Sequence, residues 1–321
     1  MALLKNTGNI ETRSGFGAGL VEAADKNANI VALCADLTSS IKMDDFKKKY
    51  PQRFFQAGIA EANMMCIAAG MAITGKIPFA GTFAEFATGR VYDQIRQSIA
   101  YSNTNVKIAA SHAGLTLGED GATHQTMEDI GLMKLLPNMV VLNPADYNQT
   151  KMATIAAVEH YGPVYIRYGR PKVPNFTPLN QPFEIGKAWK VKDGTDVTVF
   201  ATGHLLWKAI EAVEILANEN IDIELINIHT IKPLDVETIL ISINKTKAVV
   251  TAEEHLMNCG LGDSIAQVLI RNCPVPMEYV AVDDKFGESG TPEQLLDKYG
   301  LNTEGIVRAV RNVLKRKTLL N

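Results

Sequence analysis

Short apolar runs alternate with polar or amphipathic stretches over the first 170 of the 321 residues. Runs of four or five residues that are apolar throughout are typical of parallel strands buried on both faces of a sheet. The run Ile-Val-Ala-Leu-Cys at 30–34 is the clearest of them. The pattern predicts strands at 30–34, 53–56, 77–80, 106–110, 139–142 and 164–167.

Helices are predicted between these strands. Small and apolar residues crowd 62–70, and they predict a helix that starts at Glu61 and is buried on most sides. Asp146 is a suitable N-cap for the helix that follows it, to about residue 159. The remaining helices predicted in this half cover 14–24, 46–50 and 83–100. Because strands and helices alternate, we expect a doubly wound α/β sheet with its ligand site beyond the carboxyl ends of the strands.

Four prolines between 171 and 182 interrupt the periodicity and predict an extended linker. Beyond the linker the alternation resumes, with strands predicted at 197–201, 223–226, 248–251 and 278–282. The sequence therefore predicts two doubly wound domains. We expect a first α/β domain at 1–170, a linker at 171–187 and a second, smaller α/β domain at 188–321.

The composition is that of an ordinary globular protein, with 46% hydrophobic and 21% charged residues. A formal charge of -3 gives no reason to expect nucleic acid or an acidic membrane surface as a partner. No apolar run is long enough to span a bilayer, and the N-terminus lacks a signal-peptide pattern. The four cysteines are scattered without a Cys-x-x-Cys pair, which favours reduced thiols in a cytoplasmic protein.

Two segments carry residues suited to chemistry. Glu61 either complements the helix N-terminus or, with its pKa raised by apolar surroundings, serves a ligand. Its local sequence alone favours the first interpretation. The loop 111–126 places two histidines around the pair Glu119-Asp120, among glycines that let a ligand approach the backbone. These adjacent carboxylates lack the spacing of metal ligands, and no Gly-x-Ser-x-Gly elbow or standard phosphate loop is present.

Six motifs of the first half resemble the pyrimidine-binding domain of transketolase, and they occur in the family's order. They are IAEANM (59–64), TFAEF (82–86), YDQIR (92–96), SHAG (111–114), GEDGATHQ (118–125) and RYGRP (167–171). Past the linker, TIKPLD (230–235) and EEH (253–255) are similar to the family's C-terminal domain. The resemblance covers nearly the whole chain and corresponds to the C-terminal half of a transketolase.

The resemblance implies that the chain uses thiamine diphosphate. Glu61 matches the glutamate that hydrogen-bonds and activates the aminopyrimidine of this cofactor. Phe83 and Phe86 match the aromatic pocket around that ring, and Asp36 matches an acidic residue near the thiazolium. Arg90 matches an arginine near the cofactor, with one residue more after Phe86 than the family has.

The resemblance also implies a sugar phosphate substrate. Asp120 matches the aspartate that binds a hydroxyl of the donor sugar. His124 matches a catalytic position, His or Gln in the family, near the substrate and the amino group of the cofactor. The residues that match the family's phosphate-binding set are Arg13, Ser40, His112 and Arg170. Arginines suit such a site because a guanidinium can bind phosphate through two hydrogen bonds.

The other catalytic half of the family holds Mg²⁺ (or Ca²⁺) and the diphosphate through a Gly-Asp-Gly signature and an Asn, and no Gly-Asp-Gly occurs here. The chain also begins almost where the pyrimidine-binding domain begins. We therefore expect no metal ligands in this chain and a separate N-terminal subunit that supplies the diphosphate site. The expected assembly is α2β2, and the expected reaction is ketol transfer between sugar phosphates, as in the pentose phosphate pathway.

Three alternatives remain. The family of 1-deoxy-xylulose-5-phosphate synthase shares the fold and cofactor, but it usually has Asp-Arg-Ala-Gly where this chain has Ser-His-Ala-Gly at 111–114. The beta subunit of a 2-oxo acid dehydrogenase matches the length, whereas its loop differs from 118–125. A non-catalytic subunit with the same fold is the weakest alternative, because Glu61, Asp120 and His124 are intact.

Overall fold

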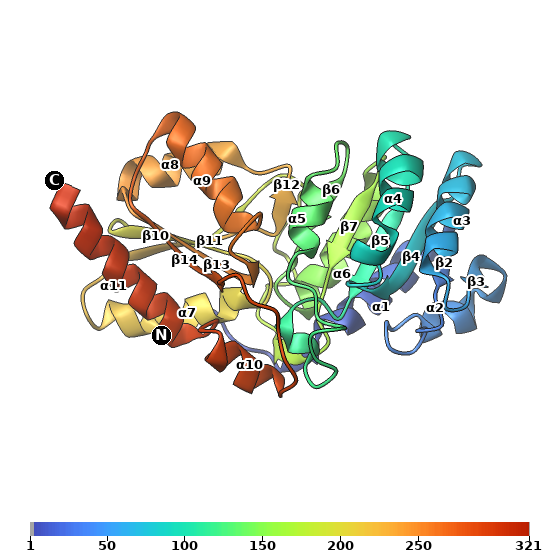
Figure 1. The fold of residues 1–321 in the computed structure, drawn as a ribbon, viewed down its shortest axis with the longest axis horizontal. Helices are drawn as coiled ribbons and strands as arrows, with labels where there is room; N and C mark the ends of the chain where they lie inside the picture. Colours follow the sequence, from blue (N-terminus) through green and yellow to red (C-terminus); the bar gives the residue numbers. More distant parts are fainter. Residues whose placement is uncertain (1–2, 321) are drawn as a thin grey trace.

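Two twisted sheets with helices on their faces lie side by side along the long axis of the molecule (Figure 1). The computed structural model describes residues 3–320 of the chain. Within these residues the first sheet contains seven strands and the second contains five. Both halves are therefore α/β, as the alternating pattern predicted.

The first sheet has the strand order β12-β6-β7-β5-β4-β2-β3, and every neighbouring pair from β6 to β3 is parallel. The strands contributed by the first half are β2 (Ile30–Cys34), β3 (Phe54–Gln56), β4 (Ile77–Phe83), β5 (Lys107–Ser111), β6 (Val140–Leu142) and β7 (Val164–Arg167). All six predicted strands of this half are present. Their carboxyl ends lie at one edge of the sheet, so the loops that follow them share that edge.

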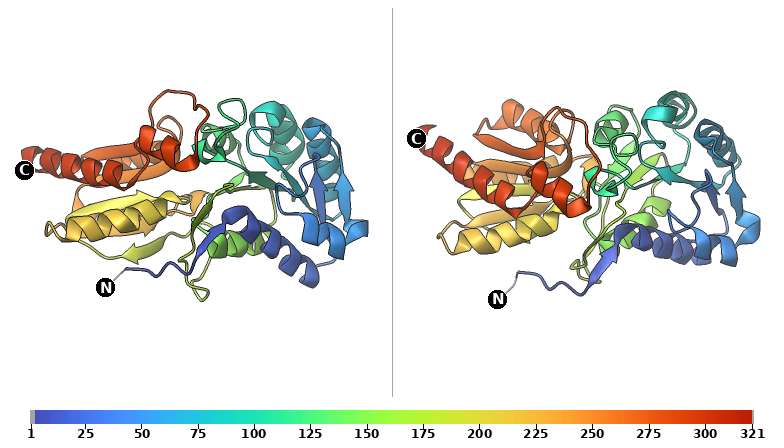
Figure 2. Two further views of the ribbon diagram at one scale, coloured as in Figure 1. Left: turned by 90° about the horizontal axis from the view of Figure 1, so that it is seen from below. Right: turned by 60° about the horizontal axis from the view of Figure 1, so that its bottom comes forward.

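Helices cover both faces of the first sheet (Figure 2). One face carries α1 (Thr12–Lys26) and α6 (Tyr147–Glu159), and the other carries α3 (Glu61–Ile73), α4 (Tyr92–Gln94) and the π-helix η3 (Ile95–Tyr101). The shorter helices of this half are α2 (Asp44–Lys49), η1 (Pro51–Arg53), η2 (Gly89–Val91), η4 (Leu115–Leu117) and α5 (Asp129–Lys134).

Two sequence features explain how α6 begins and packs. Asp146 caps it as predicted, because its carboxylate accepts a hydrogen bond from the backbone N–H of Gln149 at 2.8 Å. Gly15 lets α1 approach it closely, since a Cβ there would lie 2.3 Å from the carbonyl oxygen of Tyr147. The close packing against α6 therefore fixes the start of α1, where Arg13 lies.

The helix predicted at 83–100 is wrong over its first six residues, 83–88. β4 continues to Phe83, and the N–H of Ala84 donates to the carbonyl of Ser111 at 2.6 Å, so the chain stays beside β5. Helical structure starts only at Gly89 and continues through α4 and η3 to Tyr101. The pairing with β5 outweighs the helix propensity of the sequence after residue 83.

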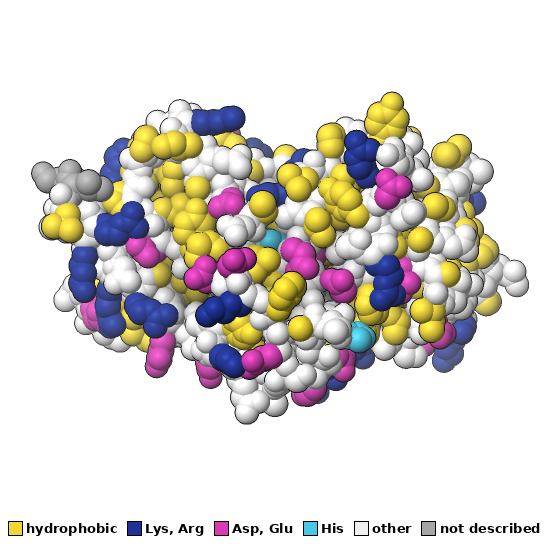
Figure 3. All heavy atoms as spheres, in the orientation of Figure 1, with side chains coloured by type: hydrophobic (Ala, Val, Ile, Leu, Met, Phe, Trp, Pro, Cys, Tyr) yellow, Lys and Arg dark blue, Asp and Glu magenta, His cyan; other side chains and the backbone are white. Residues whose placement is uncertain are grey.

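The prediction that α3 is buried on most sides is also wrong. Its buried residues are Glu61, Met64, Met65, Ala68 and Ala69, which share one face of the helix. The opposite face is exposed although it is largely apolar, with Ile67 37% and Ile73 76% exposed. Apolar side chains are also spread over the face of the molecule shown in Figure 3. α3 thus has two largely apolar faces, and the chain itself covers only one of them.

The second sheet has the order β14-β13-β10-β11-β9, in which only β9 is antiparallel to its neighbour. Its strands are β9 (Trp189–Lys192), β10 (Val197–Ala201), β11 (Ile223–Asn227), β13 (Val249–Leu256) and β14 (Met277–Val282). The helices around it are α7 (Leu205–Ala217), α8 (Val236–Thr246), α9 (Leu261–Asn272), α10 (Pro292–Lys298) and α11 (Thr303–Leu320). The first two lie on opposite faces of this sheet (Figure 1).

Backbone pairing connects the two halves. Strand β12 (Thr230–Lys232) leaves the second half and pairs antiparallel with β6 at the end of the first sheet. At the start of the predicted linker, β8 (Lys172–Pro174) pairs antiparallel with β1 (Asn9–Glu11). None of the helices within residues 3–320 has both the length and the apolar character needed to cross a membrane.

Candidate active site

Most of the predicted site residues follow the carboxyl ends of strands in the first sheet. Asp36 and Ser40 follow β2, and Glu61 follows β3 as the first residue of α3. The other members end or follow strands β4, β5 and β7; they are Phe83, Phe86, Arg90, His112, Asp120, His124 and Arg170. Arg13 reaches the same region from the first turn of α1, because it contacts Ser40 and His112.

Glu61 is a buried carboxylate with a single charged partner among the described residues. Its side chain is 4% exposed, and its Oε1 lies 3.2 Å from Nη1 of Arg90. The Arg90 guanidinium is 3.9 Å from the centre of the Phe86 ring, within the range of a cation–π contact. The carboxylate, the guanidinium and the aromatic ring therefore form one connected group.

Aromatic contacts extend this group across the site. Phe83 and Phe86 stack with ring centroids 5.9 Å apart, and Phe86 meets His124 edge-on at 5.4 Å. On its other side Phe83 stacks on the imidazole of His112 at 3.9 Å. Phe83 is the last residue of β4, and the chain turns directly after it.

Cationic side chains surround His112. Arg13 Nη1 donates to the carbonyl of Ser40 at 2.9 Å and lies 3.5 Å from His112 Nε2. The other ring nitrogen of His112 is 2.8 Å from the hydroxyl of Ser111. Burial, followed by the charges of Arg13 and Arg170, lowers the pKa of His112 to about 3. His112 is therefore neutral near pH 7 in a positively charged region.

Two residues that the sequence did not suggest belong to this region. Glu11 accepts from Arg13 Nη2 at 2.6 Å and lies 2.9 Å from Lys42 Nζ. Although burial alone would raise the pKa of Glu11, the hydrogen bonds from Arg13 and Lys42 hold it well below its usual value. Glu11 lies in the three-residue strand β1, which has no apolar run to reveal it, and Lys42 is one of several lysines in a polar segment.

Three of the predicted residues lie apart from these contacts. Asp36 is exposed, with a positive φ of 59° and its backbone N–H bonded to Gln56 Oε1 at 2.7 Å. Asp120 is an exposed residue of the loop 111–126. Arg170 donates to the carbonyl of Leu117 at 2.8 Å and pairs with Glu119 at 3.3 Å, so it approaches the cluster from the loop side.

The residue types fit an aminopyrimidine ring. A buried carboxylate needs several hydrogen bonds, and the only charged partner of Glu61 within residues 3–320 is the half-exposed Arg90. A ring nitrogen that shares a proton with the carboxyl would supply such a bond, and the aromatic pair offers a stacking surface. No group of three or more His, Cys, Asp or Glu within the described residues is placed to hold a metal ion.

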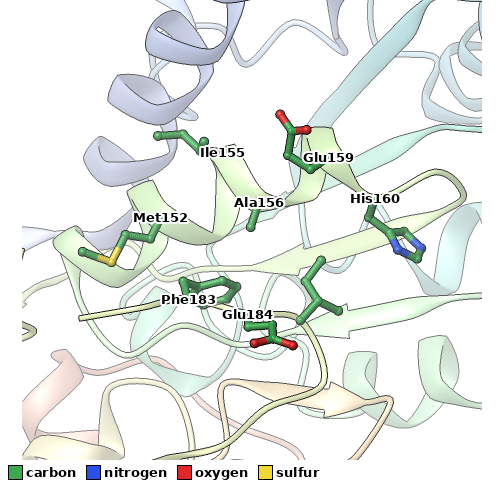
Figure 4. Close-up of a pocket in the computed structure, with 8 residues that line it drawn as sticks. Met152, Ile155, Ala156, Glu159, His160, Phe183 and Glu184 are labelled. Atoms are coloured by element: carbon green, nitrogen blue, oxygen red, sulfur yellow. The ribbon is translucent and has the colours of Figure 1, made fainter. Parts of the chain in front are cut away.

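A surface cavity of about 560 Å³ lies elsewhere (Figure 4), between α6 and the segment 183–185. Its walls are largely apolar, and it contains none of the predicted site residues. The residues that line it are Met152, Ile155, Ala156, Glu159, His160, Phe183, Glu184 and Ile185. The candidate site lies instead at the carboxyl edge of the first sheet.

The fold defines a protein of two α/β halves, with the candidate site at the edge of the first sheet. Two family models match the chain, "Transketolase, pyrimidine binding domain" over residues 8–175 and "Transketolase, C-terminal domain" over residues 186–306. The chain belongs to the transketolase family and contains these two domains in that order.

Relatives of similar length support this assignment. A "Putative transketolase C-terminal section" of Methanocaldococcus jannaschii is 43% identical over 309 residues, which cover 95% of this chain and 96% of that protein. The "6-deoxy-6-sulfo-D-fructose transketolase subunit SqwH" of Clostridium sp. (strain MSTE9) is 44% identical over 93% of this chain and 92% of its own length. A solved structure described as "Split gene transketolase, inactive beta4 tetramer" has a TM-score of 0.91 and 48% identity, over 96% of this chain and 99% of that one.

Proposed function

We propose that this chain is the C-terminal subunit of a split, thiamine diphosphate-dependent transketolase. The enzyme would transfer a two-carbon ketol unit from a ketose phosphate to an aldose phosphate. One observation carries the proposal: a continuous line of contacts runs from the buried Glu61 through Arg90, Phe86 and Phe83 to His112. A carboxylate, an aromatic wall and a cationic cluster are the three parts needed to bind an aminopyrimidine beside a phosphorylated sugar.

Glu61 would bind the ring nitrogen of the aminopyrimidine and share a proton with it, while Phe83 and Phe86 would stack against the ring. Arg90 would keep the Glu61 carboxylate in place through its 3.2 Å contact. His124 would face the reacting carbons from the edge of Phe86, and Asp36 remains the candidate for the thiazolium side. When bound, thiamine diphosphate supplies the nucleophilic carbon that breaks the carbon–carbon bond of the ketose. A buried site suits this role because proton sharing depends on a water-poor environment.

The cationic cluster would hold the terminal phosphate of the sugar. Arg13 and Arg170 offer guanidiniums, His112 offers a ring N–H, and Ser40 offers a hydroxyl near Arg13. Asp120, exposed on the neighbouring loop, would accept a hydrogen bond from a sugar hydroxyl. Arginine and serine donors around a buried imidazole favour a phosphorylated substrate over a neutral one.

A second subunit would complete the site with the diphosphate-binding domain and its Mg²⁺ or Ca²⁺, in an α2β2 assembly. The exposed apolar face of α3, whose first residue is Glu61, offers a surface for it. One relative is described as a subunit and another as a C-terminal section, and the similar solved tetramer is described as inactive. We place the assembly in the cytoplasm, in keeping with its four free cysteines.

Reconstitution tests the proposal. This chain and its diphosphate-binding partner, mixed with thiamine diphosphate and Mg²⁺, should transfer ketol units, whereas either chain alone should not. Glu61→Ala in the complex should lower kcat by roughly 10² to 10⁴, the usual range for loss of a proton-transfer group. Tight cofactor binding and turnover by this chain alone would refute the split arrangement, and full activity of Glu61→Ala would refute its role.

A substrate panel identifies the sugar. Pentose phosphates represent the pentose phosphate pathway, and 6-deoxy-6-sulfo-D-fructose represents the substrate in the name of one relative. Pyruvate consumption with release of 1-deoxy-xylulose-5-phosphate, or acylation of a lipoyl group, would instead assign the chain to one of the alternative thiamine enzymes.

A further inference from the structure

The second half of the chain holds the loop that carries Asp120 and His124. Glu254, near the end of β13, reaches into the start of this loop. Its Oε1 accepts from the backbone N–H of Thr116 at 2.7 Å, and its Oε2 lies 3.3 Å from the Thr116 hydroxyl. The loop is therefore bonded to a carboxylate 138 residues away in sequence.

Glu254 packs closely against Gly114 at the start of the loop. Gly114 has a φ of +82°, and a Cβ at this position would lie 2.3 Å from the Glu254 carboxyl carbon. Glycine is thus required both by the backbone conformation and by the carboxylate packed against it. The Glu254 side chain is 4% exposed, so the contact is shielded from water.

Glu254 itself contacts side chains from both halves. His204 Nε2, at the start of α7, lies 3.0 Å from its Oε2. Arg167, at the end of β7, donates to its backbone carbonyl at 2.9 Å and is held in turn by Asp129 at 2.7 Å. Burial alone would raise the pKa of Glu254, but His204, Arg167 and the Thr116 N–H lower it, so the carboxylate stays charged.

A second contact holds the far end of the same loop. Gln125 Nε2 donates to three carbonyls, those of Leu115 at 3.1 Å, Gly118 at 3.2 Å and Glu288 at 3.0 Å. The first two lie in the loop and the third in the segment between β14 and α10. A Cβ on Gly287 would collide with the Gln125 carboxamide, so this segment packs tightly on the loop.

We propose that Glu254 is a positioning residue for the active site. By holding Thr116 and Gly114, the carboxylate from the second half fixes the loop that presents Asp120 and His124 to the substrate. This inference rests on the proposed function for the identity of the substrate. The contacts of Glu254 with Thr116 and Gly114, called the clamp from here on, are a property of this chain alone. It assigns a role to Glu254 of the Glu-Glu-His motif and, through it, to the C-terminal half.

Glu253 provides a matched control. It precedes Glu254 in the same strand, is equally buried, and accepts from the N–H groups of Leu261 at 2.6 Å and Gly262 at 2.8 Å. These partners start α9 within the second half, so Glu253 does not touch the loop. Burial raises its pKa to about 7. Glu253→Gln therefore perturbs a buried carboxylate without releasing the clamp.

Hydrogen exchange on the isolated chain tests the clamp without any assumption about activity. Glu254→Ala should speed amide exchange over 114–126 by roughly tenfold or more, because a charge-assisted hydrogen bond is lost. Glu254→Gln keeps the acceptor and should retain most of the protection. Glu253→Gln should affect 261–262 and leave the loop unchanged. Unchanged loop exchange in a folded Glu254→Ala chain would overturn the proposal, as would equal loosening of the loop in Glu253→Gln.

Kinetics of the reconstituted complex test the consequence. Glu254→Ala should lower kcat/KM for the sugar donor about tenfold or more with cofactor affinity unchanged, and Glu254→Gln should restore most of it. Glu253→Gln should behave as the wild type. Wild-type kinetics for Glu254→Ala with a loosened loop would overturn the positioning role. An inactive wild-type complex would refute the proposed function and leave the exchange result as the test of the clamp.

Discussion

The ring of Phe83 stacks on the imidazole of His112 with centroids 3.9 Å apart. This contact joins the two parts of the site, because Phe83 also stacks on Phe86 of the aromatic wall while His112 lies beside Arg13 of the cationic cluster. The aromatic face covers the imidazole and the nearby cations oppose its protonation, which explains its low pKa. A bound substrate phosphate and a bound cofactor ring would thus both affect the stacked pair of Phe83 and His112.

Phosphate should raise the pKa of His112. In the free chain burial and the charges of Arg13 and Arg170 lower this pKa to about 3. A phosphate bound among these groups would offset their charge and favour the protonated imidazole. NMR titration of the His112 ring, with and without inorganic phosphate, measures the shift.

The Arg170→Ala variant serves as the control for this titration. Removing Arg170 should raise the pKa of His112 in the free chain and weaken its response to phosphate, since one cation near the ring is lost. Identical titration curves with and without saturating phosphate would remove His112 from the anion site.

His112 should make the chain less stable in acid. Its pKa in the folded chain, about 3, is below the ordinary value of 6.5, so the unfolded chain takes up a proton first as the pH falls. Protonation then favours unfolding from pH 6.5 downward, and the full stability is present above that pH. His112→Phe keeps the aromatic stack and removes the titration.

Denaturant unfolding at pH 7.5 and pH 5.0 measures this effect. Between the two conditions the wild type should lose up to about 2 kcal/mol more unfolding free energy than His112→Phe, at about 1.4 kcal/mol per pH unit below 6.5. Comparing the two chains cancels the contributions of other buried groups. Parallel losses in both chains would show that His112 titrates normally.

The sequence was sufficient to predict the parallel sheet and the sheet edge at which the candidate residues lie. Uninterrupted apolar runs such as Ile30–Cys34 are shielded from water only when helices cover both faces of the sheet, which determines the α/β class. The parallel arrangement alone then predicts that the loops after these strands meet at one edge of the sheet. Glu61, His112 and Arg170 each follow a strand of this sheet for that reason.

The remaining features depend on contacts between distant residues. The turn after Phe83 results from pairing with β5, and the sequence around it favours a helix. Lys42 joins the cationic cluster only through Glu11, which lies 31 residues earlier in the sequence and 2.9 Å away. The contact of Glu254 with Thr116 links positions 138 residues apart, and no local pattern reveals such a pair.

Arg170 should matter more for phosphorylated substrates than for others. Arg170→Ala in the complex should lower kcat/KM for a ketose phosphate by roughly 10- to 100-fold, the value of one or two charge-assisted hydrogen bonds. Hydroxypyruvate, a donor without phosphate, should lose little. Arg271→Ala, an exposed arginine in the last turn of α9, is the control and should leave both donors unaffected. Equal losses on the two donors would remove Arg170 from the phosphate site.

The exposed face of α3 should be needed for assembly with the partner subunit. Ile67 and Ile73 lie on this face, 37% and 76% exposed, so aspartate at either position should leave the isolated chain folded. In the assembly, a charge would replace an apolar side chain and weaken binding by about 10- to 100-fold in Kd. Analytical ultracentrifugation of mixtures with the diphosphate-binding partner measures the loss. Ile215→Asp on α7, 44% exposed in the second half, is the matched control and should assemble normally. If Ile67→Asp and Ile73→Asp both assemble like the wild type, the partner binds another face.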